Sequence, residues 1–183
     1  MKTITRETGS VLWTIDPFHT TVGFSVRHLL ITNVHGVFER VSGSVRYDAA
    51  APESTVIRVE IPADSINTRA PQRDAHLRSP DFWDAENHPK ITYKSTSAKV
   101  DGDDLITVGD LTIKGVSHPV EITWEFNGIA KDPYGTTKAG FEGTSTIKRS
   151  DWGITWNAAL ETGGFMISDK VKLVLEVEAD KKA

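Results

Sequence analysis

Apolar and polar residues alternate with a period of two along most of the chain, which is the pattern of strands with one buried face. The clearest example is 119–130, where Val120, Ile122 and Trp124 alternate with polar residues. The same pattern predicts seven more strands, at 11–30, 36–48, 54–66, 90–100, 104–115, 136–148 and 170–180. Within the second of these, Phe38 is out of phase with the apolar residues that follow, which predicts a bulge near Glu39.

The alternation stops between 69 and 89, where the sequence is polar. Pro71 suits the first turn of a helix and Pro80 marks its end, so we expect a short helical insert at about 69–80. Arg69 and Arg73 would share a face of that helix and could hold a phosphate or carboxylate. A solvated face with local ion pairs to Asp74 and Asp81 is the other interpretation.

About eight strands with short connections predict an all-β, mostly antiparallel fold in one domain, 1–183, whose residues 1–10 form a flexible or peripheral segment. A closed eight-stranded barrel gives every strand one buried face and leaves no open edge. A two-sheet sandwich satisfies the same periodicity. Strands of about 11–13 residues would extend roughly 36–43 Å, which favours a tall barrel for a long, thin ligand.

Composition excludes several classes of function. The chain has no cysteine, hence no disulfide, thiol nucleophile or thiolate metal site. Its net charge of −4 and the lack of a basic block argue against nucleic-acid binding. No apolar run is long enough for a transmembrane helix. The first ten residues lack the apolar stretch of a secretory signal, so we expect a cytoplasmic protein.

Histidines are the main candidates for chemistry. His19 and His28 are nine residues apart, so on a regular strand they point to opposite faces. His35 lies in a predicted turn. The sequence has no H-x-H, H-E-x-x-H or G-x-S-x-G motif. A metal-dependent or other enzyme on the barrel would therefore need His19, His28 or His35 to meet a carboxylate such as Asp16.

Alternation also places His28 on the inner face, together with the apolar residues of its strand, near one end of a channel. A structural hydrogen bond and contact with a ligand head group both remain open for its ring. Three glycines at inward positions, Gly43, Gly109 and Gly143, are either gaps that leave a channel or points of barrel curvature.

Four segments together resemble the YceI-like family of bacterial lipid-binding proteins: "WTIDPFHTTVGFSVRHL", "HGVFERVSGSVRYD", "HLRSPDFWDAENHPKITYKSTS" and "VGDLTIKGVSHPVEI". "TSTIKRSDWGI" is similar to the family's penultimate-strand motif, with Trp152 in place of the usual phenylalanine. The resemblance runs from residue 13 to about 178. It implies an extended, lipocalin-like eight-stranded antiparallel barrel around a hydrophobic pore for polyisoprenoid, quinone-like or fatty-amide chains. It implies no catalytic residues, and it makes a homodimer an expectation.

Together these observations predict a non-catalytic protein without cofactor or metal that binds, stores or transports a long-chain amphiphile such as a polyisoprenoid or isoprenoid quinone. A lipid-free interaction module is a further alternative, which would show an exposed apolar patch and no internal cavity. The candidate wall residues are Phe24, Val26, His28, Val45, Ile57, Val59, Ile61, Leu111, Ile113, Ile122, Trp124, Phe126, Phe141, Leu173 and Leu175. The candidate mouth residues are Phe82, Trp83, Trp152, Trp156, Phe165 and Met166.

Overall fold

The computed structural model describes residues 9–182, so most of the predicted peripheral segment 1–10 lies outside the described residues. The strands within this range are β1 (Val11–Ile15), β2 (Thr21–His28), β3 (Thr32–Phe38), β4 (Ser42–Tyr47), β5 (Val56–Pro62), β6 (Ile66–Asn67), β7 (Lys90–Asp101), β8 (Asp104–Ile113), β9 (Val116–Lys131), β10 (Thr137–Lys148) and β11 (Ile167–Lys181). The helical segments are η1 (Pro52–Ser54), η2 (Ala63–Ser65), α1 (Pro71–Arg78) and η3 (Arg149–Trp152).

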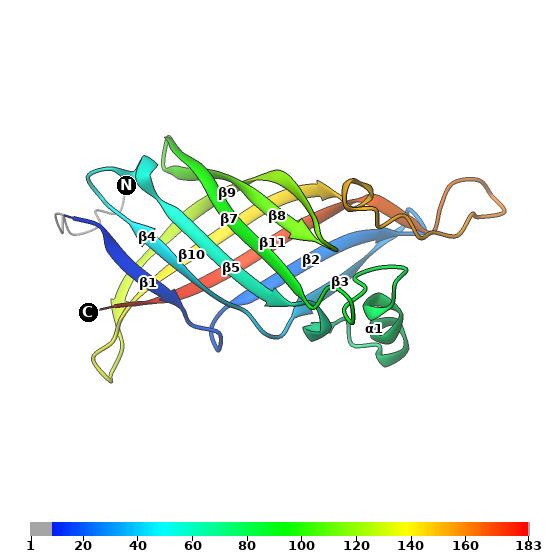
Figure 1. The fold of residues 1–183 in the computed structure, drawn as a ribbon, viewed down its shortest axis with the longest axis horizontal. Coiled ribbons are helices and arrows are strands. Elements are labelled where there is room, and N and C mark those ends of the chain that lie inside the picture. Colours follow the sequence, from blue (N-terminus) through cyan, green and yellow to red (C-terminus); the bar gives the residue numbers. More distant parts are fainter. Residues whose placement is uncertain (1–8, 183) are drawn as a thin grey trace.

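These strand segments form one closed antiparallel barrel of eight strands (Figure 1). β11 pairs with β2 along most of its length and with β1 near its end, so β1 and β2 act as one interrupted strand. In the same way β3 joins β4, and β5 joins β6. The closed ring confirms the predicted barrel and excludes the two-sheet sandwich.

Two features of the first strands differ from the prediction. The predicted strand 11–30 is interrupted after β1, where Asp16 Oδ1 accepts a hydrogen bond from the backbone N–H of Phe18 at 2.9 Å and forms a local turn. The β2–β3 turn lies at 29–31, where Leu29 and Leu30 have φ of 52° and 62°. His35 therefore lies within β3, paired with Ser25, and not in a turn. The parity change near Glu39 corresponds to the interruption between β3 and β4.

One half of the barrel is filled by side chains. Val45 and Ile57 are paired across β4 and β5 and are buried, as is Trp13 on β1. The ring of Phe141 packs 5.4 Å from that of Phe126 between β9 and β10. None of these residues lines the free space inside the barrel, which lies toward α1.

The opposite end carries α1 and the long loop that follows η3 (Figure 1, right). The predicted helical insert is confirmed, although it begins at Pro71 and its N-cap residue, Ala70, makes no side-chain hydrogen bond. The buried Asp74 instead anchors the helix, because its Oδ1 accepts hydrogen bonds from the N–H and the hydroxyl of Thr68 at 2.8 and 2.6 Å. Between residues 9 and 182, no helix is both long and apolar enough to cross a membrane.

Candidate functional site

A cavity of about 450 Å³ occupies the half of the barrel next to α1. That volume falls within the range of about 300–1,000 Å³ that ligand pockets typically have. Residues of β2 and β11 contribute more of its wall than those of any other strand, with further residues from β5, β7, β8 and β9, and most of the lining side chains are apolar. Several of them, such as Phe24, Val26 and Leu173, are only half-buried, because their inner surfaces face empty space rather than other side chains.

The floor of the cavity is a set of aromatic rings held by one buried hydroxyl. Tyr93 and Trp124 are the last lining residues on β7 and β9 before the packed half. Thr107 Oγ1 lies 3.1 Å from the Tyr93 hydroxyl and accepts a hydrogen bond from Trp124 Nε1 at 3.0 Å. Burial raises the pKa of the Tyr93 hydroxyl, which therefore stays protonated. The hydrogen bonds among these groups hold the two floor rings in place on β7 and β9.

Two of the inward glycines make room for these floor rings. A Cβ on Gly109 would lie 2.6 Å from Tyr93 Cζ, and one on Gly143 would lie 2.6 Å from Trp124 Cζ3. A Cβ on Gly43 would meet the Arg58 carbonyl oxygen and the side chain of Ile15. The glycines therefore do not open a channel at these points, since neighbouring atoms occupy the space above each of them.

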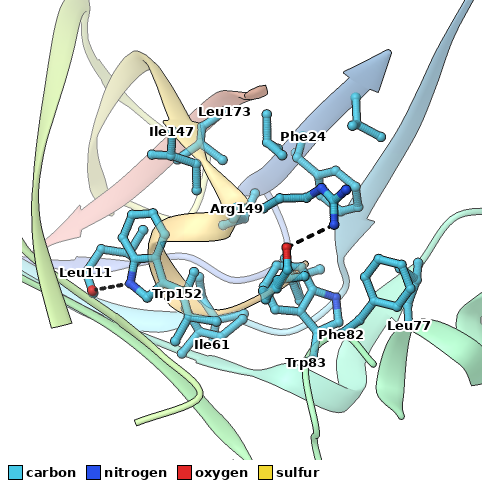
Figure 2. A pocket seen from close by; sticks show the side chains of 18 of the residues that line it. Phe24, Ile61, Leu77, Phe82, Trp83, Leu111, Ile147, Arg149, Trp152 and Leu173 are labelled. Carbon is cyan, nitrogen blue, oxygen red and sulfur yellow. Dashed lines mark hydrogen bonds between the residues drawn. The ribbon is translucent and has the colours of Figure 1, made fainter. Parts of the chain in front are cut away.

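Most of the predicted site residues lie on the cavity. They are Phe24, Val26, His28, Val59, Ile61, Phe82, Trp83, Leu111, Ile113, Ile122, Trp124, Trp152, Trp156, Met166, Leu173 and Leu175. Figure 2 shows several of them around the cavity, with the hydrogen bond from Trp152 Nε1 to the Leu111 carbonyl oxygen, 3.0 Å long. Their contact with a ligand stays a prediction.

The remaining predicted residues lie elsewhere. Val45, Ile57, Phe126 and Phe141 point inward as expected, but they belong to the packed half below the floor. Alternation reports which face a residue occupies and carries no information about its depth in the barrel. Phe165 lies in the irregular loop before β11 and is 61% exposed, so it does not line the cavity.

α1 supplies part of the cavity rim, which alternation did not predict. Gln72, Arg73, His76 and Leu77 of this helix reach the lining. The His76 ring packs edge-on against Trp156 with a centroid distance of 4.7 Å, and its Nε2 lies 2.8 Å from Asp81 Oδ2. Arg69 precedes the helix, has a φ of 63° and is exposed. It therefore does not share a helix face with Arg73, and the proposed arginine pair does not form.

Arg149, in η3, is a functional candidate that the sequence pattern missed. Only 8% of this residue is exposed. Its Nε donates to the Ser168 carbonyl oxygen at 3.0 Å, and its Nη1 donates to the carbonyl oxygens of Ile154 and Trp156 at 2.9 Å each. Burial lowers the pKa of the Arg149 guanidinium, and the charge of Asp169 partly opposes this. Figure 2 shows Arg149 among the lining side chains.

His28 lies on the inner face near the mouth, as its parity predicted. Within the described part of the chain its ring has no hydrogen-bond partner, so the structure supplies no protein acceptor for a purely structural role. Contact with a ligand head group stays a prediction.

The other histidines do not build a catalytic centre around His28. His19 Nδ1 lies 2.7 Å from Asp16 Oδ2 and 3.5 Å from Glu178 Oε1, outside the cavity. Among the described residues this is the one group with the donors for a metal ion. The Lys138 ammonium is already bound there, 2.8 Å from Asp16 and 2.9 Å from Glu178. The hydrogen bond between Lys138 and Asp16 lowers the pKa of the Asp16 carboxyl and raises that of the Lys138 ammonium.

A YceI-like domain model matches residues 13–179. The chain belongs to the YceI-like family. It is also 38% identical over 161 residues to a UPF0312 protein of Ectopseudomonas mendocina, a match that covers 87% of this chain and 81% of that protein.

Solved structures share the YceI-like fold. A Campylobacter jejuni YceI protein superposes with a TM-score of 0.73 at 35% identity, over 86% of this chain and 90% of that one. A polyisoprenoid-binding domain from Saccharophagus degradans superposes with a TM-score of 0.69 over 93% and 98% of the two chains. At 16% identity the latter shows a common fold.

Proposed function

We propose that this YceI-like protein binds a long-chain amphiphile, such as a polyisoprenoid or isoprenoid quinone, in its barrel and stores or carries it. The observation behind the proposal is the apolar cavity of about 450 Å³ between the floor at Tyr93 and Trp124 and the rim at α1. The polyisoprenoid-binding domain that shares the fold supports this class of ligand.

Apolar burial alone would provide substantial affinity in such a cavity. Each buried CH₂ group contributes about 0.8 kcal/mol, so an isoprenoid chain needs few polar contacts. The half-buried inner side chains of β2 and β11 offer the surface that the chain would cover. Binding in this form requires no catalytic residue, and we propose that the protein performs no chemistry on its ligand.

The lipid-free interaction module is less consistent with the structure, because it requires a barrel without an internal cavity. Exposed apolar residues do occur at the β2–β3 turn, where Leu30 and Ile31 are 65% and 76% exposed. This turn lies at the same end of the barrel as α1 (Figure 1). The homodimer expected for a YceI-like protein stays a prediction, which light scattering on the purified protein would test.

Extraction of the purified protein with organic solvent, followed by mass spectrometry, tests the proposal. We expect a lipid at close to one molecule per chain, and we expect delipidated protein to bind geranylgeraniol in a saturable manner. Failure to recover a lipid, together with failure to bind geranylgeraniol, would overturn the proposed function.

A further inference from the structure

A buried cation faces the cavity with part of its hydrogen-bonding capacity unused. Arg149 donates to three backbone carbonyl oxygens through Nε and Nη1, as described above. Its Nη2 group has no acceptor among residues 9–182, although the residue is 92% buried and lines the cavity. A guanidinium presents its donors in a planar fork, so a free Nη2 can bind an oxygen without disturbing the other three bonds.

The charged side chains that line the cavity around Arg149 are all cationic among the described residues. Neither aspartate nor glutamate occurs among the described residues that line the cavity, while Arg149 and the rim residue Arg73 both do. Asp169, the acidic residue that acts on Arg149, accepts hydrogen bonds from the N–H and hydroxyl of Ser150 instead. Among residues 9–182, Arg149 is therefore buried without a paired carboxylate, which is an unusual state for a charged side chain.

A second donor in the lining also lacks an acceptor. Trp83 Nε1 is buried and has no hydrogen-bond partner within the described part of the chain. Trp83 packs edge-on against Phe38 at 5.4 Å, and both residues line the cavity. The lining thus offers unused donors at two places. The described lining contains no carboxylate side chain that could accept a hydrogen bond from either donor.

We propose that Arg149 binds an anionic head group, a carboxylate or a phosphate monoester, of the amphiphile inside the barrel. The apolar chain then runs from Arg149 along the walls toward the floor at Tyr93 and Trp124. This inference rests on the proposed function and narrows it, because it selects acidic amphiphiles over neutral ones with the same chain. Binding of the head group to Nη2 leaves the three carbonyl groups that already hold the guanidinium in place.

A set of ligands with one chain and three head groups tests the head-group preference. The probes are geranylgeranoic acid, geranylgeranyl phosphate and geranylgeraniol, titrated into delipidated protein at pH 8 and followed by isothermal calorimetry. We expect at least one of the two anionic probes to bind at least about tenfold more tightly than the alcohol, because charge-assisted hydrogen bonds are the stronger ones. Equal affinity for all three probes would overturn the inference and leave the proposed function standing.

Substitutions of single arginines then identify which residue causes the preference for anionic probes. In Arg149→Gln, we expect the ratio of the affinity for the anionic probe to that for the alcohol to fall to about twofold or less. The matched control is Arg27→Gln, the same change of charge on the exposed face of β2, where Arg27 Nη1 contacts Asn33 Oδ1 at 3.4 Å. Arg27→Gln should keep the full preference. Loss of the preference in Arg73→Gln, with its retention in Arg149→Gln, would place recognition at the rim and overturn the inference.

The variant Arg149→Gln also loses bonds that hold the loop after η3, so its folding is checked by circular dichroism. If Arg149→Gln does not fold, the comparison of wild type with Arg73→Gln still shows whether the rim arginine accounts for the preference for anionic probes. An anionic preference that survives removal of the rim arginine supports Arg149, and a preference that disappears contradicts it. Absence of binding for all three probes would instead remove the proposed function itself.

Discussion

Trp124 Nε1 donates a 3.0 Å hydrogen bond to Thr107 Oγ1, and the Tyr93 hydroxyl lies 3.1 Å from the same oxygen. Thr107 is fully buried, with an exposed fraction of 0%. Three strands, β7, β8 and β9, thus meet at one hydroxyl group beneath the cavity. Buried polar groups of this kind stabilise a structure only while every member keeps a partner.

Thr107→Val should lower the free energy of unfolding by about 1–3 kcal/mol, because the Trp124 N–H would stay buried without an acceptor. Urea unfolding measured by fluorescence gives this value. Thr144→Val, at an exposed position on β10, is the matched control and should change stability little. Similar effects in both variants would show that the Thr107 hydroxyl does not hold the floor.

Alternation allowed most of the barrel to be predicted, because it reports which face of a strand is buried. It failed at the β2–β3 turn, since "LLI" at 29–31 is apolar like a strand while Leu29 and Leu30 adopt left-handed backbone angles. No local signal marks that turn, because Gly36, the nearest glycine after it, lies inside β3.

The residues of the candidate site could be predicted only in part, because alternation identifies inward-facing residues but not their depth in the barrel. Parity placed Phe24 and Leu173 on the cavity correctly, but it also selected Phe126, which fills the packed half of the barrel. Depth along the axis depends on strand register, which a single sequence does not reveal. Arg149 was missed because it follows β10 in a short 3-10 turn, where strand parity no longer applies.

Gly143→Ala should destabilise the protein by roughly 1–3 kcal/mol, because the added Cβ would lie 2.6 Å from the Trp124 ring, which cannot move without breaking its bond to Thr107. Gly140→Ala on the same strand is the control, as its Cβ would lie 3.6 Å from Asn127 Cβ, an ordinary contact. Thermal unfolding of the two variants, followed by circular dichroism, distinguishes them. Equal midpoints would contradict the close packing of Trp124 on Gly143.

His19 should stabilise the fold in a pH-dependent manner. The hydrogen bond to Asp16, aided by the charges of Asp16 and Glu178, raises the pKa of His19 above its ordinary 6.5. The folded state therefore binds the proton more tightly than the unfolded state, and this stabilisation is fully present below about pH 6.5. It is lost as the pH rises through the raised pKa.

Unfolding midpoints of wild type and His19→Gln should accordingly differ most at pH 5.5 and converge at pH 9. Because Lys138 and the exposure of His19 weaken the effect, we expect a small difference. His35→Gln, exposed on β3, is the control and should show no such trend. A gap between wild type and His19→Gln that widens toward pH 9 would have the wrong sign for this mechanism.

Leu173→Trp should reduce lipid binding without unfolding the barrel. Leu173 lines the cavity and is half-buried, so a larger side chain has room to extend into the space that the ligand would occupy. Lys172→Trp adds the same ring at the neighbouring exposed position, on the outer face of β11. We expect the affinity for geranylgeraniol to fall at least about tenfold in Leu173→Trp, since several CH₂ groups lose their site at about 0.8 kcal/mol each, and to stay unchanged in Lys172→Trp. If both variants bind geranylgeraniol as wild type does, the lipid occupies another surface and the cavity beside Leu173 is not the binding site.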